Sequence, residues 1–206
     1  MGMNKYYVDL VVCLDVTGKQ APLLDEYKKG IKSLPIDIAM NMSADNKDIE
    51  QIRIKIISFR DYAFDDEPMT ESVFYSLPEQ MNNFCSYVDS IEAKGGGDAF
   101  ENVLEAIALA IQSDWTQGAQ KCVQRIIVMT GSEPLELGER KDVSKTPYPQ
   151  NMPASIEELK KLWYGRGAIQ STMDTSVAEM VVPIAVNCEI WREMSTWRGC
   201  DIHIPA

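Results

Sequence analysis

The stretch YYVDLVVCLDVTGK, residues 6–19, places an apolar, β-branched run directly before an aspartate, a threonine, a glycine and a lysine. Residues 6–14 are apolar on both faces after Asp9, which is typical of a central parallel strand covered on both sides. Asp15 follows at the end of this strand, where sheets of this kind place their ligand-binding loops. The stretch therefore predicts both the fold class and the position of a functional loop.

Strand-like and helix-like segments alternate along the rest of the chain. Pro35 should end or kink the first helix, because proline interrupts the helical hydrogen bonds. The further strands expected are residues 52–59, 72–77, 123–130, 179–186 and 201–204. The helices expected are residues 24–34, 81–91, 100–111, 155–165 and 188–197. The alternation predicts an α/β fold for a single domain spanning residues 1–206, with a doubly wound, mainly parallel sheet, helices on both faces and one short antiparallel edge strand at residues 72–77.

The composition is that of an ordinary globular protein, with 206 residues, 45% hydrophobic and 25% charged. The net charge of −11 argues against nucleic acid as a partner, because a phosphate backbone normally requires a basic patch. No apolar run approaches the roughly 20 residues that span a bilayer, and residues 6–14 do not read as a secretory signal. We therefore expect no membrane partner and a cytoplasmic location. Five cysteines without a CxxC pair favour reduced thiols over disulfides or zinc.

Three polar loops are expected at the carboxyl ends of the strands, where ligands bind in such sheets. They are DVTGK at residues 15–19, GGGDAFEN at residues 95–102 and MTGSEP at residues 129–134. Together with FRDY at residues 59–62, they resemble the von Willebrand factor A domain, in particular its bacterial intracellular branch. The resemblance covers nearly the whole chain.

The resemblance implies a metal-ion-dependent adhesion site, in which hydroxyls and carboxylates from three loops hold Mg²⁺ and leave a position for a partner's carboxylate. Matched to that site, Asp15 takes the place of the first aspartate, Thr17 that of the first hydroxyl, and Asp98 that of the second-loop ligand. Lys19 falls where a second hydroxyl is expected, and Gly131 where the third aspartate is expected.

These two departures predict a degenerate metal site, with no cofactor or only weakly bound Mg²⁺. Lys19 brings a positive charge that can pair with Asp15 and offset the attraction for a divalent ion. The double change Lys19→Ser with Gly131→Asp should then restore metal binding. Ser132 and Glu133 complete the set of residues expected to modulate the site or contact a partner, and Glu133 either replaces the missing carboxylate or is an ordinary loop charge.

Other interpretations of the same residues remain open. Asp98 and Glu101 fit a capping box at the start of the next helix. Asp15 and Thr17 fit a pair that orders its own loop through backbone amides. His203 is expected to be a structural residue at a strand end. The three tryptophans of the carboxyl-terminal third are expected to be packing residues, at positions 163, 191 and 197.

The favoured function is a non-enzymatic protein-interaction module whose crevice at Asp15, Thr17 and Asp98 faces a protein partner. The alternative is a phosphotransferase or phosphatase of the haloacid dehalogenase type, with Asp15 as the nucleophile. The late acidic pair that such enzymes use to hold Mg²⁺ is missing after MTGSEP. A phosphate-binding P-loop is weaker still, because the glycine and Ser/Thr spacing around Gly18 and Lys19 is wrong.

Overall fold

The central sheet of the computed structural model has seven strands and is mainly parallel, in the order β3-β2-β1-β6-β8-β9, with β4 also paired to β2. The structure describes residues 5–119 and 121–205, so residues 1–4, 120 and 206 of the expected domain lie outside the described residues. The strands of this sheet are β1 (Lys5–Asp15), β2 (Asp48–Phe59), β3 (Met69–Glu71), β4 (Tyr75–Leu77), β6 (Cys122–Met129), β8 (Ala178–Val182) and β9 (Cys200–Ile202). Since β3 and β4 alone run antiparallel to their neighbour, the predicted fold class is confirmed.

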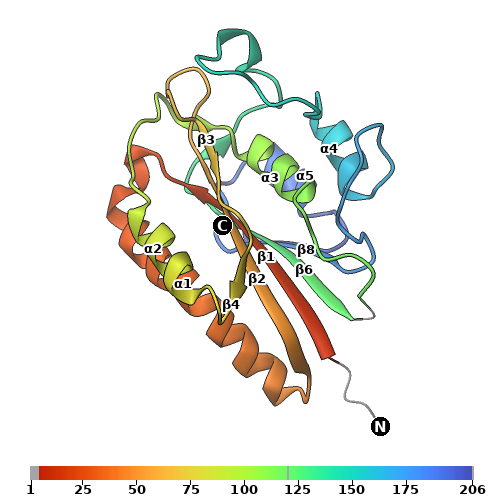
Figure 1. The fold of residues 1–206 in the computed structure, drawn as a ribbon. Coiled ribbons are helices and arrows are strands. Elements are labelled where there is room, and N and C mark those ends of the chain that lie inside the picture. The colour runs from red at the N-terminus through yellow and green to blue at the C-terminus, as the bar shows by residue number, and fades with distance from the viewer. Residues whose placement is uncertain (1–4, 120, 206) are drawn as a thin grey trace.

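Helices cover both faces of the sheet (Figure 1), and the alternation of side chains along β1 explains why. Val8, Leu10 and Val12 pack with the core under two helices, and Val11 and Cys13 pack with the core on the opposite face. A strand buried on both faces needs a layer of helices on each side. The first face carries α1 (Ala21–Ala44) and α2 (Met81–Ser90), and the second carries α3 (Val103–Ile111), α4 (Ile156–Trp163) and α5 (Glu189–Met194).

Pro35 was expected to end or kink the first helix, and the structure excludes the first alternative, because α1 continues through Pro35. Its buried residues Leu24, Ile31, Pro35 and Met42 recur on one face, and Pro35 is itself part of that apolar stripe. Packing of an amphipathic face supplies most of the stability of a helix inside a protein. That packing here outweighs the roughly 3 kcal/mol that an interior proline costs.

The edge strand expected at residues 72–77 is instead two short strands, β3 and β4, separated by a break. At the start of the break the Ser72 hydroxyl accepts a hydrogen bond from the Ile56 backbone N–H at 2.9 Å. The antiparallel pairing with β2 is as predicted, and only the bounds differ.

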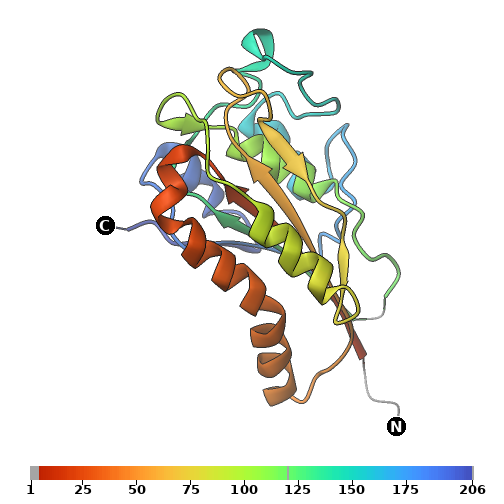
Figure 2. The same cartoon turned by 60° about the vertical axis from the view of Figure 1, so that its left-hand side comes forward.

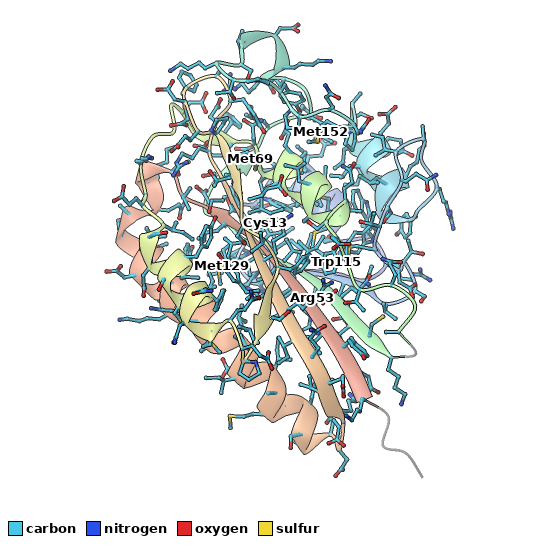
Figure 3. All side chains as sticks on the ribbon, viewed as in Figure 1. Cys13, Arg53, Met69, Trp115, Met129 and Met152 are labelled. Carbon is cyan, nitrogen blue, oxygen red and sulfur yellow. The ribbon has the colours of Figure 1, made fainter. Side chains whose placement is uncertain are left out.

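A largely buried ion pair links the middle of β1 to the middle of β2. Arg53 donates two hydrogen bonds to Asp9, at 2.8 and 2.7 Å, and its guanidinium lies 4.5 Å from the centroid of the Phe74 ring. Phe74 in turn meets Trp115 edge to face at 5.9 Å. Figure 3 shows Arg53 and Trp115 near each other on this part of the sheet.

The closing segment of the chain packs as the sequence suggests. The three tryptophans at positions 163, 191 and 197 are buried in the core on the α3 face. His203 is exposed, and its backbone N–H donates to the Val182 carbonyl at 2.9 Å, which extends the pairing of β9 with β8. Within the described residues, no helix combines the length and apolar character that a bilayer crossing requires.

Candidate functional site

The candidate site lies where the winding of the sheet reverses, at the carboxyl end of β1. This strand pairs in parallel with β2 on one side and β6 on the other. Backbone hydrogen bonds join the loop after β1 to the end of β2, from Val16 N–H to the Phe59 carbonyl at 3.1 Å, and to the glycine-rich loop after α2, from Gly18 N–H to the Gly95 carbonyl at 3.0 Å. The segments 60–67 and 135–150 project beside each other above this end of the sheet in both views (Figures 1 and 2).

Asp15 is completely buried, and its carboxylate accepts five hydrogen bonds from uncharged groups. Oδ1 accepts from the Thr17 backbone N–H at 3.1 Å and from the Thr17 hydroxyl at 2.8 Å. Oδ2 accepts from Gln20 Nε2 at 3.2 Å, from the Thr130 hydroxyl at 3.1 Å and from the Ser132 hydroxyl at 2.7 Å. Asp15 therefore ties the loop after β1 to the loop after β6.

Gln20 contacts Asp15 in the place predicted for Lys19, so the expected pairing of Lys19 with Asp15 was wrong. Lys19 is exposed on the 3-10 helix Gly18–Gln20, and in the described part of the chain it forms no ion pair. Gln20, the next residue, points inward and is buried. One step along a 3-10 helix turns a side chain by about a third of a circle, which separates the two directions.

Gly131 leaves space for the Gln20 amide rather than for a metal-binding carboxylate. A Cβ atom at this position would lie 2.8 Å from Gln20 Nε2 and 3.2 Å from Gln20 Oε1. The double change Lys19→Ser with Gly131→Asp is therefore no longer expected to rebuild a metal site, because Gln20 occupies the space that the new carboxylate needs.

Replacing Gly131 by alanine should cost about 1–2 kcal/mol in the free energy of unfolding, since the new methyl group displaces the Gln20 amide from Asp15. In a Gln20→Ala background the same change should cost less than about 0.5 kcal/mol. Urea-induced unfolding of the four proteins measures the difference. Equal costs in the two backgrounds would show that the amide and Gly131 do not interact.

Asp98 forms a separate ion-pair cluster and takes no part in the hydrogen bonds around Asp15. Its Oδ2 accepts from Arg140 Nη2 at 2.6 Å, and Arg140 Nε donates to the buried Asp61 at 3.0 Å. The capping-box interpretation was also wrong, because α3 begins at Val103 and Asn102 precedes it. Asp98 Oδ1 instead accepts from the Phe100 N–H at 2.8 Å. The predicted second-loop ligand therefore anchors the loop that carries Arg140.

Glu101 is the carboxylate that the structure brings toward Asp15, whereas the sequence analysis expected it only in a capping box. Phe100 and Glu101 form the short strand β5, which pairs in parallel with β7 (Glu133–Pro134). Strand alternation leaves Phe100 partly exposed and buries Glu101 completely. Burial raises the pKa of Glu101 to about 8, and the negative charges of Asp15 and Asp61 add to this effect. Lys19 lies close enough to lower that pKa in part.

Gly96 permits this close approach. Its φ of +77° belongs to the left-handed region that favours glycine. A Cβ at Gly96 would lie 3.0 Å from both Glu101 Oε1 and Thr17 Cβ, so those two atoms lie within twice that distance of each other. The glycine-rich loop is therefore where the Glu101 carboxylate and the Thr17 side chain come together. The GGG run in the sequence was the signal for this approach.

The last two residues expected to modulate the site have different environments. Ser132 belongs to the Asp15 cluster through its hydroxyl. Glu133 lies on β7 and lines a separate groove with Phe100, Pro134 and Cys188. Glu133 therefore does not supply the carboxylate that the family pattern expects at position 131.

The oxygen atoms near Asp15 are of the kind that hard divalent cations take, but both Asp15 oxygens already accept hydrogen bonds from the protein. The Thr17 and Ser132 hydroxyls donate their hydrogens to Asp15, which leaves their oxygen lone pairs free. Mg²⁺ is often held by one or two carboxylates and keeps several waters. Among residues 5–119 and 121–205, no group of three or more His, Cys, Asp or Glu side chains is arranged to hold a metal. A cation here would depend on two carboxylates and a hydroxyl.

No family model and no curated protein matches the chain. Its fold is similar to that of two crystal structures of the pilus adhesin SpaC from Lactobacillus rhamnosus GG. The open conformation has a TM-score of 0.51 at 14% identity, over 94% of this chain and 27% of the adhesin. A second form has a TM-score of 0.50 at 12% identity, over 90% and 26%. The chain thus spans about a quarter of the adhesin, and at these identities the likeness shows the mainly parallel α/β fold alone.

Proposed function

We propose that this chain is a non-enzymatic protein-binding module of the von Willebrand factor A type, whose partner docks at the carboxyl end of the sheet. The observation that carries this proposal is two partly exposed aromatic side chains on the loops at this end of the sheet, each of which lines a groove of its own. Phe64 is 45% exposed and Phe100 is 39% exposed. Aromatic anchors next to a polar centre are the composition that protein interfaces favour.

The two rings are held in place by the same loops that surround Asp15. A Cβ at Gly97 would lie 2.2 Å from the Phe64 ring, so the ring rests directly on the glycine-rich loop. The Arg140 guanidinium lies over the same ring, 5.4 Å from the Phe64 centroid. Phe100 is fixed by the β5–β7 pairing. A preformed surface of this kind loses little side-chain entropy on binding, which favours affinity.

The similar solved structures are described as a pilus adhesin, and we propose that binding is also the role of this chain. The five cysteines are free, which supports our proposal of a reducing, cytoplasmic setting. The phosphotransferase alternative gains no support from the geometry. A nucleophilic carboxylate must present an oxygen to its substrate, whereas Asp15 is completely buried with both oxygens hydrogen-bonded.

The test is affinity capture from the native cell with a crevice variant and a matched surface variant. The crevice variant is Phe64→Ala with Phe100→Ala. The matched variant is Ile36→Ala with Met40→Ala, which removes two comparably exposed apolar side chains from α1. Quantitative mass spectrometry should find a protein retained by the unmodified chain and the α1 variant but reduced at least tenfold with the crevice variant.

The captured protein should then bind the purified chain directly, with the same order of affinities. A partner lost with the α1 variant, or recovered equally by all three proteins, would contradict the proposed docking surface. Both variants alter exposed side chains, so circular dichroism and thermal unfolding should show intact folds.

A further inference from the structure

An apolar groove with a volume of about 650 Å³ lies between α1, the end of β4 and the start of α2. One wall is the carboxyl-terminal half of α1, where Ile36 and Met40 have exposed fractions of 56% and 67%. The other wall is formed by Pro78, directly after β4, and Met81, the first residue of α2. Here α1 extends past α2 (Figure 2), at the other end of the sheet from the candidate site.

The carboxyl-terminal half of α1 is apolar on more faces than the sheet covers. Between residues 34 and 44 the polar positions are Asp37, Asn41 and Ser43 alone. The sheet-facing stripe of α1 is buried, whereas Ile36 and Met40, about one helical turn apart, line the groove. A helix with apolar side chains on all sides is normally covered on all sides. We therefore expect a further element to pack on this stripe.

The groove has the dimensions of a short helix. From Pro35 to Ser43 the α1 wall spans roughly 12 Å at 1.5 Å per residue, which is about two helical turns. The small side chain of Ala39 on this wall lets a helix approach closely. An added strand is disfavoured, because the amino-terminal part of β2 carries Asp48 and Glu50, and Glu50 is an extra residue in the pairing with β1.

The charges beside the groove indicate the sequence of the occupant. Asp37 on α1 and Glu79 beside the opposite wall are both exposed, and neither forms an ion pair within the described part of the chain. The flanking cations along the chain, Lys32 and Lys47, are already held in ion pairs at 2.7 and 2.8 Å. An apolar segment flanked by lysine or arginine complements this rim. A second copy of the chain does not, because a twofold contact would bring the same acids of two molecules of charge −11 together.

We propose that this groove binds a basic amphipathic helix of another protein. The apolar face of that helix packs on Ile36, Met40 and Met81, and its lysine or arginine residues lie beside Asp37 and Glu79. Methionine side chains adapt their shape to a partner, and an apolar groove along a helix is a common way to bind one. The inference goes beyond the proposed function and does not depend on it, because the groove and the polar loops lie at opposite ends of the sheet.

Fluorescence anisotropy of a labelled probe peptide tests the proposal. The probe is a helical peptide of about four turns, with leucine at every third or fourth position and lysine at the others. The unmodified chain should bind it saturably. Two control peptides should bind at least about tenfold more weakly, which corresponds to about 1.4 kcal/mol. One has the same composition in scrambled order and no apolar face, and the other has glutamate in place of lysine.

Two variants of the chain locate the binding surface. Ile36→Ser with Met40→Ser should weaken binding of the leucine–lysine probe at least about tenfold, because it removes two apolar contacts of the α1 wall. Val143→Ser with Ile184→Ser is the matched control, since these side chains are 59% and 65% exposed but lie outside the groove. That control should bind within about twofold of the unmodified chain. Circular dichroism and thermal unfolding should show intact folds for both.

A third variant tests the charges of the rim. Asp37→Asn with Glu79→Gln should weaken binding of the lysine probe and make that binding less dependent on salt. Full binding by this variant, with an unchanged salt dependence, would overturn the basic character assigned to the occupant.

Three further results would overturn the proposal. They are no saturable binding by the unmodified chain, equal binding of the scrambled peptide, and undiminished binding by Ile36→Ser with Met40→Ser. A dimer of the unmodified chain in sedimentation velocity that this variant abolishes would also overturn it, because a second copy would then occupy the groove. The probe should bind Phe64→Ala with Phe100→Ala as well as it binds the unmodified chain, which separates this surface from the one proposed at the polar loops.

Discussion

Replacing Asp15 by alanine should lower the free energy of unfolding by about 3–5 kcal/mol, even without metal or partner. The change removes one acceptor that serves five donors, and three of these are buried hydroxyl groups. Buried donors without an acceptor each retain a desolvation cost. Urea-induced unfolding followed by circular dichroism measures the loss, with an unchanged slope against urea as the sign of an intact two-state transition.

Asp98→Ala is the matched control for Asp15→Ala. Asp98 is also an aspartate of the polar loops, but its side chain is 37% exposed and its ion pair with Arg140 lies near the surface. Its removal should cost less than about 1 kcal/mol. A cost below 1 kcal/mol for Asp15→Ala as well would show that the five hydrogen bonds do not stabilise the fold. The result also means that Asp15→Ala is unsuitable for binding tests, and Asp15→Asn is the better variant.

Replacing Glu101 by glutamine should stabilise the protein in chelator, and the gain should increase with pH to about 2–3 kcal/mol above pH 8. Burial raises the Glu101 pKa from 4.5 to about 8. Below pH 4.5 the carboxyl group is protonated in both the folded and the unfolded chain. Between 4.5 and 8 the unfolded chain loses this proton and the folded chain keeps it, so the stability of the unmodified protein falls. Glutamine does not ionise, so the variant does not lose stability as the pH rises.

The expected gain in stability for Glu101→Gln is smaller than the free energy that corresponds to the whole pKa shift. A shift from 4.5 to about 8 corresponds to an upper limit of roughly 5 kcal/mol, and relaxation of the crevice with entry of water reduces it. Thermal and urea unfolding at pH 5, 7 and 9 in chelator measure the trend, with Asp98→Asn as a control for a nearby exposed carboxylate. A difference between Glu101→Gln and the unmodified protein that does not change with pH would contradict the assigned burial of the carboxyl group.

Local patterns in the sequence were sufficient for the elements with a clear apolar pattern. The strands β1 and β6 and the helix α2 lie within one residue of their predicted ends, because each pattern is compatible with only one type of secondary structure. The polar loops also lie where the sequence placed them, because the carboxyl ends of parallel strands share one edge. Asp15 and Thr17 are adjacent there, as predicted.

Tertiary contacts decided the elements whose local signal was overruled by packing. Pro35 is a helix breaker by its own chemistry, but the apolar stripe of α1 continues beyond it onto the sheet. Phe100 and Glu101 fit the helical period of the next segment, yet pairing with Glu133 and Pro134 draws them into a strand. Such pairing joins residues more than 30 positions apart and leaves no periodic trace in the sequence.

The sequence by itself determined the α/β fold, the edge at which the loops gather and the position of an aspartate at the end of β1. Only the tertiary structure decided which side chains meet at that edge. Gln20 rather than Lys19 reaches Asp15, and Glu101 rather than Asp98 faces it. Spacing along a strand fixes where a loop begins, but the direction of a loop side chain depends on backbone turns and on neighbours from distant segments, which no local pattern encodes.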